Sequence, residues 1–261
     1  MTESASPALA SSMAIEDAAV LFRKAQRVVV LTGAGISTPS GIPDFRSEGS
    51  GLWSRDEPME VASLNTFRTV PERFFNWFQP LAGQIFNAQP NAAHFALAEF
   101  ENSGHLQTII TQNIDALHQK AGSKHVVEMH GTLRTVSCTN CFKQFESAPF
   151  LLPYIEMGKI PKCLSCNGIL KPDVILFGEQ LPQAAWVEAQ RAAQRCDLML
   201  VAGSSLEVLP VAGLPMQALD RGAHLIILNN TPTYLNVRAD VVIMDDVAAT
   251  LPEIAKRVLH G

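Results

Sequence analysis

Short apolar runs alternate with amphipathic stretches along most of the chain, and this alternation predicts its secondary structure. Apolar runs of this kind are typical of parallel strands that are covered on both faces. The expected strands are residues 28–31, 105–110, 197–202, 224–228 and 239–244. The expected helices are residues 14–26, 91–102, 184–194, 211–221 and 250–259. Strand and helix in alternation predict an α/β fold with a doubly wound parallel sheet.

Four stretches depart from this alternation. Residues 1–12 are small and polar, so we expect a disordered tail there. Residues 33–53 are rich in Gly, Ser and Pro and are too long for a plain connection, which favours a functional loop. Residues 54–87 carry spaced aromatic side chains and predict short helices that form an apolar lid or small module. Residues 133–169 hold two pairs of cysteines.

Composition and charge narrow the functional classes. The 261 residues are 47% hydrophobic and 17% charged, which suits one large domain, or one domain with an insertion, around a sizeable core. The net charge of -5, without any run of Lys or Arg, argues against direct nucleic-acid binding. We recognise neither a secretory signal nor an apolar run that would span a bilayer, so we expect a cytoplasmic protein with no membrane partner.

The four paired cysteines predict a metal site. Cys138 and Cys141 form one C-x-x-C pair, and Cys163 and Cys166 form a second pair after 21 intervening residues. Each pair can present two thiolates to one tetrahedral ion, so the spacing predicts a structural zinc site whose filled shell leaves no position for chemistry. Four unligated thiols are the alternative. Cys196, at the start of an expected strand, is interpreted as a small core residue.

A glycine-rich turn follows the first expected strand directly. Gly33, Ala34 and Gly35 would let the backbone turn tightly and approach a pyrophosphate, although a purely structural turn is the alternative. The six-position dinucleotide fingerprint needs Gly or Ala at position 38, where this chain has Thr38. A hydride-transferring Rossmann enzyme therefore fits poorly.

The same loop continues with an acid, an aromatic ring and an arginine, at Asp44, Phe45 and Arg46. A functional interpretation is a mobile flap in which Phe45 shields a reactive centre and Arg46 meets a phosphate or ribose. The alternative is a capped surface loop that is anchored by a buried Phe.

Polar side chains gather where the strand expected at residues 105–110 ends. Gln112, Asn113 and Asp115 follow that strand, and His130 lies in a His-Gly turn soon afterwards. Ligands of open α/β sheets bind beyond the carboxyl ends of the strands, so this cluster predicts a site. We favour His130 as the general base among seven histidines. His118 could simply pair with Asp115.

Two later strands also end in small polar residues. Gly203, Ser204 and Ser205 follow one expected strand, and Asn229 and Asn230 follow the next. Hydroxyl and amide groups at neighbouring strand ends suit contacts to ribose and phosphate. Helix capping is the alternative role, since Ser and Asn both favour it.

Together these motifs resemble the sirtuin family of NAD-dependent protein deacylases over about residues 14–259. The matching motifs are Gly33-Ala34-Gly35-Ile36-Ser37, Gly41-Ile42-Pro43-Asp44-Phe45-Arg46, Thr111-Gln112-Asn113-Ile114-Asp115, His130-Gly131, the two cysteine pairs, Lys171-Pro172-Asp173-Val174, Phe177-Gly178-Glu179 and Gly203-Ser204-Ser205. So many ordered motifs make a chance resemblance negligible.

The resemblance implies two domains. A Rossmann-like NAD-binding domain would comprise residues 13–53, 88–132 and 170–261. A smaller inserted domain would join a helical module, residues 54–87, to a Cys₄ zinc module, residues 133–169. NAD and an acyl-lysine substrate would enter the cleft between the domains.

The resemblance also implies roles for individual residues. His130, Asn113 and Asp115 would be catalytic, with His130 as the general base. NAD would be held by Gly33, Ala34, Gly35, Asp44, Phe45, Arg46, Gln112, Asn113, Ile114, Asp115, Gly203, Ser204, Ser205, Asn229, Asn230 and Val247. The substrate would pair as an added strand with a segment that contains Val174, Phe177, Gly178 and Glu179. One structural zinc ion would be bound by Cys138, Cys141, Cys163 and Cys166.

The implied reaction is the NAD-dependent removal of acetyl groups from protein lysines. Nicotinamide leaves, the acyl oxygen attacks the exposed ribose carbon, and His130 removes a ribose hydroxyl proton so that this oxygen attacks the imidate. The products would be free lysine, nicotinamide and O-acetyl-ADP-ribose. Sirtuins that favour succinyl or malonyl groups share a Tyr-x-x-Arg pair in the helical module, where this chain has no Tyr. Acetyl groups, and longer apolar acyl groups beside Phe74, Trp77 and Phe78, therefore fit better.

Other functions compete with this interpretation. A protein mono-ADP-ribosyltransferase could use the same pocket and would yield a modified acceptor protein. A zinc-ribbon binding module with a vestigial nucleotide fold is a third possibility, and the intact Asn113, Asp115 and His130 argue against it. A hydride dehydrogenase is disfavoured by Thr38.

Overall fold

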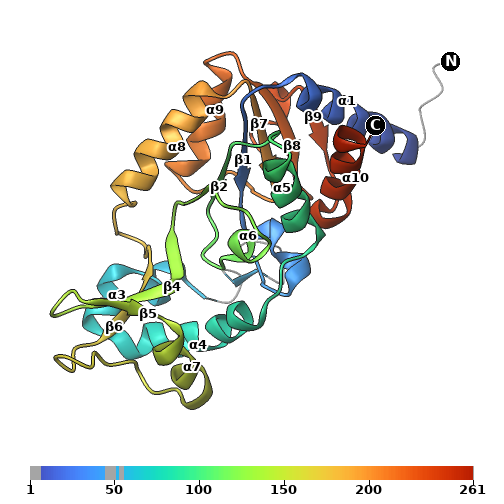
Figure 1. Ribbon diagram of the computed structural model, residues 1–261. Helices are drawn as coiled ribbons and strands as arrows, with labels where there is room; N and C mark the ends of the chain where they lie inside the picture. Colours follow the sequence, from blue (N-terminus) through green and yellow to red (C-terminus); the bar gives the residue numbers. More distant parts are fainter. Residues whose placement is uncertain (1–6, 45–50, 53–55, 261) are drawn as a thin grey trace.

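The computed structural model describes residues 7–44, 51–52 and 56–260. Figure 1 shows an upper part built on a parallel sheet with helices on both sides. A lower part holds helices and a small antiparallel sheet. None of the described helices combines the length and the apolar composition that crossing a bilayer requires.

The upper part is organised by one parallel sheet. Its strands are β1 (Val28–Thr32), β2 (Thr108–Thr111), β3 (Val126–Glu128), β7 (Leu198–Ala202), β8 (His224–Leu228) and β9 (Val241–Ile243). They lie in the order β3-β2-β1-β7-β8-β9, all parallel. The chain order reverses between β1 and β7, and ligands of such sheets bind at this switch point. The predicted doubly wound α/β fold is confirmed.

Two layers of helices bury the faces of this sheet. On one face lie α1 (Pro7–Lys24), α5 (Ala92–Asn102) and α10 (Val247–Leu259), packed with Val28 and Val30. On the other face lie α8 (Gln183–Arg195) and α9 (Leu214–Leu219), packed with Val29 and Leu31. Because successive side chains of a strand point to opposite faces, the unbroken apolar run of β1 contributes to both cores.

The N-terminal helix is longer than the sequence predicted. Helix α1 begins at Pro7 instead of residue 14, so residues 7–12 are helical where we expected a disordered tail. Proline is tolerated in a first helical turn, because the N–H groups there have no partner within the helix. Residues 1–6 lie outside the described part of the chain.

Other element boundaries differ from the predictions in smaller ways. The strand expected at residues 105–110 is β2, which begins at Thr108. The helix expected at residues 211–221 is a 3₁₀ turn, η4 (Val211–Gly213), followed by the short α9. Helix α10 begins three residues early, because the carboxylate of Asp246 accepts a hydrogen bond from the N–H of Ala249 at 2.8 Å and caps it.

The lower part shares a single apolar core. Helices α2 (Pro58–Val61), α3 (Leu64–Thr69) and α4 (Pro71–Asn87) come from the region where we predicted short helices, although α4 has 17 residues. The antiparallel sheet has the order β5 (Gln144–Glu146), β4 (Gly131–Cys138) and β6 (Leu170–Val174), and α7 (Ala148–Met157) follows β5. Phe75 of α4, Val136 of β4 and Tyr154 of α7 belong to the same cluster of buried side chains. The domain boundaries given above stay a prediction.

Candidate active site

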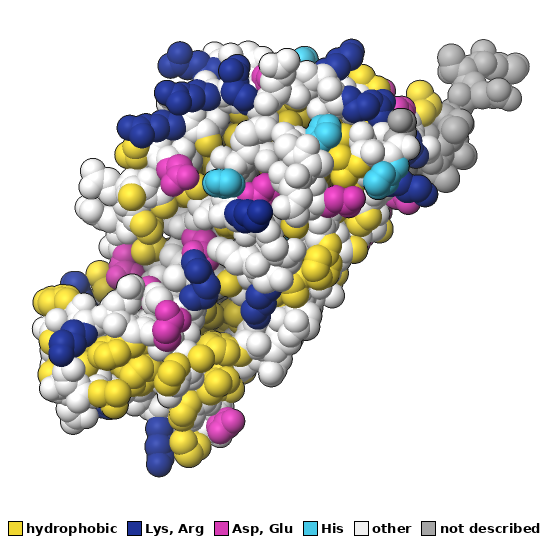
Figure 2. All heavy atoms as spheres, viewed as in Figure 1, with side chains coloured by type: hydrophobic (Ala, Val, Ile, Leu, Met, Phe, Trp, Pro, Cys, Tyr) yellow, Lys and Arg dark blue, Asp and Glu magenta, His cyan; other side chains and the backbone are white. Residues whose placement is uncertain are grey.

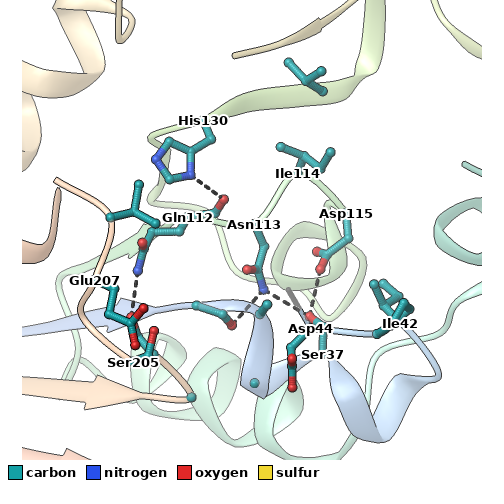
Figure 3. Close-up of a pocket in the computed structure, with 18 of the residues that line it drawn as sticks. Ser37, Ile42, Asp44, Gln112, Asn113, Ile114, Asp115, His130, Ser205 and Glu207 are labelled. Carbon is teal, nitrogen blue, oxygen red and sulfur yellow. Dashed lines mark hydrogen bonds between the residues drawn. The ribbon is translucent and has the colours of Figure 1, made fainter. Parts of the chain in front are cut away.

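A cleft lies beyond the carboxyl ends of β1, β2 and β7, where the upper and lower parts meet. It encloses a cavity of about 750 Å³. Its walls include Gly33, Gln112 and Gly203 from the strand ends of the large sheet, and Phe74 and Val174 from the lower part. Figure 3 shows how the polar side chains come together in it. The cavity therefore occupies the place that the strand order predicts for a ligand.

Glycines let two loops meet at the floor of this cleft. The N–H of Gly35 donates to the carbonyl oxygen of Gly203 at 2.9 Å. A Cβ atom on Gly33 would lie 2.8 Å from the same oxygen, and one on Gly35 would lie 2.9 Å from the Cα of Gly203. Gly203 itself has a φ of 64°, in the region that glycine tolerates best. Both turns therefore need glycine for their packing against each other, which is the structural role given above as the alternative to ligand binding.

Asn113, Ser37 and Asp115 form one hydrogen-bonded cluster (Figure 3). The amide Nδ2 of Asn113 donates to the carbonyl oxygen of Gly33 and to Oγ of Ser37, at 3.1 Å each. The hydroxyl of Ser37 donates in turn to Oδ2 of Asp115 at 2.7 Å. The orientation of the Asn113 amide is therefore fixed by two acceptors.

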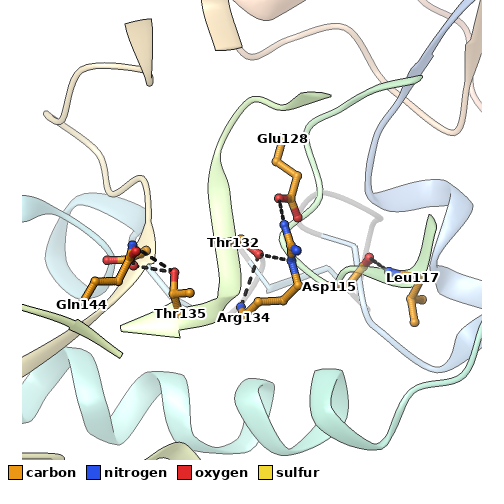
Figure 4. Close-up of polar contacts among 8 residues, drawn as sticks. Asp115, Leu117, Glu128, Thr132, Arg134, Thr135 and Gln144 are labelled. Carbon is orange, nitrogen blue, oxygen red and sulfur yellow. Dashed lines mark hydrogen bonds and ion pairs between the residues drawn. The ribbon is translucent and has the colours of Figure 1, made fainter. Parts of the chain in front are cut away.

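The second carboxylate oxygen of Asp115 is also occupied. The N–H of Leu117, at the start of α6 (Leu117–Lys120), donates to Oδ1 at 2.9 Å (Figure 4). Burial raises the pKa of Asp115, and the hydrogen bonds from Leu117 and Ser37 oppose that rise. The alternative pairing of His118 with Asp115 is wrong, because Ser37 and Leu117 hold the carboxylate and His118 bonds elsewhere.

A layer of buried hydroxyl groups supports the segment that carries Asn113. The hydroxyl of Thr32 donates to Oγ1 of Thr111 at 2.8 Å, and that oxygen accepts the N–H of Asn113 at 3.1 Å. Nε2 of His118 lies 2.9 Å from Oγ1 of Thr32. Burial lowers the pKa of His118 well below its usual value, and the neighbouring His94 lowers it further. His118 is therefore a neutral, buried partner of Thr32.

His130 lines the cavity from the turn between β3 and β4. Its Nδ1 lies 3.0 Å from the carbonyl oxygen of Gln112. Because a carbonyl oxygen can only accept, Nδ1 carries the proton and Nε2 keeps a free lone pair. Burial lowers the pKa of His130, and the hydrogen bond to Gln112 partly opposes this. The imidazole is thus prepared to accept a proton at Nε2.

One ion pair and one glycine fix the backbone on either side of His130, and Figure 4 shows the ion pair. The guanidinium of Arg134 donates to Oε2 of Glu128 at 2.6 Å and joins β4 to β3. Gly131 has a φ of 77°, and a Cβ atom there would overlap the carbonyl oxygen of Asp173. The histidine therefore depends on a glycine directly after it, which is the His-Gly turn noted in the sequence.

The strand ends at β7 and β8 contribute further polar groups. Nε2 of Gln112 donates to Oγ of Ser204 at 2.8 Å, and Nδ2 of Asn229 donates to the carbonyl oxygen of Thr231 at 2.8 Å. Neither Ser204 nor Asn229 caps a described helix. Their positions on the cavity wall favour the ligand-contact interpretation over helix capping.

The segment expected to bind substrate lies on one edge of the cavity. The N–H of Phe177 donates to the carbonyl oxygen of Ala62 at 3.0 Å and so joins this segment to the loop before α3. The carbonyl oxygen of Phe177 accepts the N–H of Leu64 at 2.9 Å. Glu179 is held by Lys171, whose Nζ lies 3.0 Å from Oε2.

The structure brings the candidate residues together. The described candidates that line the cavity are Gly33, Ala34, Gly35, Asp44, Gln112, Asn113, Ile114, Asp115, His130, Val174, Phe177, Gly178, Glu179, Gly203, Ser204, Ser205, Asn229, Asn230 and Val247. Phe45 and Arg46 lie outside the described residues. The individual roles of all these residues stay predictions.

Sequence reasoning gave no role to some residues of the cavity. Ser37 was noted only as part of a motif, yet it joins Asn113 to Asp115. The loop of Glu207, Val208 and Leu209 lines the cavity without carrying any motif that we recognise. Spacing from the glycine turn could have pointed to Ser37, whereas nothing in the sequence pointed to the loop.

The four paired cysteines form one cluster in the lower part, and their sulfur atoms all lie within 4.8 Å of one another. Sγ of Cys138 lies 3.4 Å from Sγ of Cys166, and Sγ of Cys141 lies 3.7 Å from Sγ of Cys163. A tetrahedral zinc ion with bonds of about 2.3 Å needs sulfur atoms about 3.8 Å apart. The N–H of Cys141 lowers the pKa of Cys138 to about 6, whereas the pKa of Cys166 is raised to about 12, because the N–H of Gly168 lowers it less than Cys138 and burial raise it. The cluster fits one structural zinc ion, as predicted.

Comparison with known proteins agrees with this geometry. Residues 33–210 match the sequence model of the Sir2 family. NAD-dependent protein deacylase 2 of Archaeoglobus fulgidus is 43% identical over 94% of this chain and 96% of its own length. The NAD-dependent protein deacetylase of Saccharolobus solfataricus is 46% identical over 88% of this chain and 91% of its own length.

Solved structures show the same fold. One, described as giving the structural basis for the mechanism and regulation of Sir2 enzymes, has a TM-score of 0.88 and 41% identity, and the match covers 95% of this chain and 99% of that one. A Sir2 protein bound to a propionylated peptide has a TM-score of 0.82 and 37% identity, over 94% of this chain and 97% of that one.

Proposed function

This chain is a member of the Sir2 family, and from that premise we propose that it removes acetyl groups from lysine side chains of proteins with NAD as co-substrate. Nicotinamide and O-acetyl-ADP-ribose are released together with the free lysine. The observation that carries this proposal is a neutral, half-buried His130 in the same cavity as the Asn113–Ser37–Asp115 cluster. The names of the relatives and the peptide complex among the solved structures support it.

His130 is the general base of this reaction. A base must be unprotonated to act, and burial keeps the imidazole neutral at physiological pH. The hydrogen bond from Nδ1 to Gln112 leaves Nε2 to accept the proton of a ribose hydroxyl. Once Nε2 is protonated, the same carbonyl oxygen stabilises the imidazolium.

The cavity is suited to hold NAD. Backbone groups of the two glycine turns and the amides of Gln112 and Asn113 offer hydrogen bonds on its floor, and Ser204 and Asn229 line the adjoining wall. When bound, NAD supplies the ribose carbon that accepts the acyl oxygen. Asn113 and Asp115 act by holding the ribose and nicotinamide side of the pocket, with Ser37 fixing both side chains.

The acyl-lysine enters past the segment that contains Val174, Phe177, Gly178 and Glu179, and its peptide backbone pairs with this segment as an added strand. Zinc maintains the lower part without taking part in chemistry, because four thiolates fill its coordination shell. Thiolates that serve as metal ligands suit a reducing compartment, so we place the reaction in the cytoplasm.

A second candidate is the removal of longer apolar acyl groups by the same site. One wall of the cavity consists of apolar side chains on a single face of α4, at Phe74, Trp77, Phe78, Leu81 and Ile85. Ile42 and Ile114 also line the cavity and pack with the same apolar cluster. Trp77 is the only one of these five side chains of α4 that is partly exposed, so it offers a longer acyl chain an apolar surface to cover.

Mass spectrometry of a mixture of enzyme, NAD and an acetyl-lysine peptide tests the proposal. We expect free peptide and O-acetyl-ADP-ribose in equal amounts, both lost with His130→Ala. His260→Ala is the matched control, because His260 is exposed and far from the cavity. Release of nicotinamide without deacetylated peptide would favour ADP-ribosyl transfer, and no consumption of NAD with any acyl peptide would refute both functions.

A further inference from the structure

A second hollow lies at the opposite end of the large sheet, where β1, β7 and β8 begin. It has a volume of about 570 Å³ and is lined by Arg27, Gln194, Arg195, Cys196 and Arg221. The cleft lies beyond the other ends of these strands. At about 3.3 Å per residue, a strand of five residues such as β1 separates the two hollows by about 17 Å. A ligand in one hollow therefore cannot reach the other.

Three arginines converge on this hollow from separate segments. Arg27 lies in the loop before β1, Arg195 in the last turn of α8, and Arg221 in the turn after α9. All three are exposed, and within the described part of the chain no hydrogen bond or ion pair engages their guanidinium groups. The hollow has no acidic residue among its described lining residues.

The positive charge at this end is a local departure from the charge of the whole chain. Figure 2 shows Lys and Arg side chains gathered at the end of the molecule where α8 and α9 lie. The chain carries a net charge of -5, so this cluster is not the result of a generally basic surface.

The carboxylate of Asp197, directly after the lining residue Cys196, is turned into the backbone. Asp197 follows Cys196 directly, and its Oδ1 accepts the N–H of Arg27 at 2.8 Å while Oδ2 accepts the N–H of Gln26 at 3.0 Å. Its carbonyl oxygen accepts the N–H of His224 at 2.9 Å. Asp197 thus ties together the segments that lead to Arg27, Arg195 and Arg221, and it does so without lining the hollow.

A purely structural role explains only part of this arrangement. Cations near the carboxyl ends of helices are stabilising through the helix dipole, which accounts for Arg195 and for Arg221 separately. It does not account for Arg27, which precedes a strand. Nor does it explain why three guanidinium groups that have no partner among the described residues surround one hollow.

We propose that this hollow binds a small polyanion with two or more adjacent phosphate groups. The planar donor fork of a guanidinium matches the oxygen atoms of a phosphate, and arginine holds its charge at any physiological pH. Three such groups around one hollow match several linked phosphates better than a single carboxylate. The proposal is independent of the deacetylase function, because it uses none of the residues of the cleft.

Isothermal titration with inorganic triphosphate tests this site. The protein is first saturated with NAD, so that the cleft is occupied, and the salt concentration is kept near 0.15 M to suppress diffuse charge effects. We expect one triphosphate per chain, and a loss of affinity of at least tenfold in the double variant Arg195→Gln, Arg221→Gln. Arg191→Gln is the matched control, because Arg191 is an exposed arginine one turn earlier on α8 that does not line the hollow.

Several outcomes would overturn the proposal. These are the absence of binding at this salt concentration, equal affinity in the wild-type protein and the double variant, and displacement of triphosphate by further NAD. Equal weakening by Arg191→Gln would indicate a diffuse basic surface instead of a site. The thermal unfolding temperatures of the variants show that each one is folded, so that a loss of binding reports on the arginines.

Discussion

Nδ1 of His130 donates to the backbone carbonyl oxygen of Gln112 across 3.0 Å. Gln112, which follows β2, thereby sets the tautomer of His130, which precedes β4. Gln112 also donates from its side chain to Ser204, so this one residue connects the expected base to the strand ends of the large sheet. The expected base and the wall of the cavity at Ser204 are thus connected through Gln112.

We expect this geometry to appear in the pH dependence of the reaction. The pKa of His130 is lowered by burial, and a base acts only in its neutral form. The acid limb of kcat/KM should therefore fall at a pH below about 6.5, the ordinary value for histidine. Initial rates with an acetyl-lysine peptide, measured between pH 5 and pH 8 in buffers of constant ionic strength, give the profile. An acid limb centred above the ordinary value would contradict the assignment.

Replacing Ser37 should impair the reaction more than it impairs the fold. Ser37→Ala removes one hydrogen bond of the buried Asp115 and one acceptor of the Asn113 amide. A buried polar group left without its partner costs about 1–3 kcal/mol, so kcat/KM for NAD should fall about tenfold to a hundredfold. Ser40→Ala is the control, since Ser40 bonds Asn91 outside the cavity. Equal kinetics for the two variants would argue against a role for Ser37.

The apolar wall predicts a selective effect on acyl length. Trp77→Gln should lower kcat/KM for a hexanoyl-lysine peptide by about tenfold more than for an acetyl-lysine peptide. Each buried methylene contributes about 0.8 kcal/mol, and only the longer chain gains by covering this wall. Trp186→Gln provides the control, because Trp186 is a half-buried tryptophan of α8 that does not line the cavity. A parallel loss for both peptides would show that Trp77 only supports the fold.

The fold was more predictable than the site because apolar periodicity records burial. Residues 28–31 of β1 are apolar and buried on both faces, so the strand was predictable from its composition. Helix α4 is harder, since Pro80 within it favours a break. The structure keeps one helix there because Phe74 and Phe75 pack against Phe67 of α3, Phe78 stacks on Phe74, and this packing outweighs the lost hydrogen bond.

The hydrogen-bond partners within the site include backbone groups, which the type of residue does not reveal. The acceptor that fixes His130 is a backbone carbonyl, and any residue at position 112 would supply one. The glycines of the first turn are explained by contact with Gly203, about 170 residues away in the chain. A motif can therefore indicate which residues lie together in the site. The structural reason why each residue type is needed comes from contacts with distant parts of the chain.

Removal of zinc should unfold the lower part before the upper part. The thiolates of the cluster join the turn after β4 to the turn before β6, and Cys138 and Cys163 are also members of the apolar core. Without the ion, Cys138 and Cys166 keep only a contact of 3.4 Å between their sulfur atoms, so this core loses its cross-link. Hydrogen exchange after chelation should show faster exchange in β4, α7 and β6 than in β1 and β7. Full deacetylase activity in a verified zinc-free protein would contradict this expectation.

Stability should decrease in mild acid because of His94. Its Nδ1 accepts the N–H of Asn91 at 3.3 Å, its Nε2 is buried without a partner in the described structure, and burial lowers its pKa to about 4. The unfolded chain, in which histidine titrates near 6.5, therefore binds more protons between these two pH values. Stability is then complete above pH 6.5 and is lost as the pH falls towards 4, by about 3 kcal/mol from this group.

Urea unfolding at pH 7 and pH 5 measures this loss. His94→Gln, which keeps an acceptor for Asn91 but does not titrate, should lose less stability between the two pH values than the wild-type protein. His260→Gln should lose as much as the wild-type protein, because His260 is exposed. The ring centroid of His118 lies 4.9 Å from that of His94, and burial also lowers the pKa of His118. Part of the loss of stability in acid should therefore persist in His94→Gln. Identical slopes for all three proteins would mean that the neutral state of His94 does not contribute to folding.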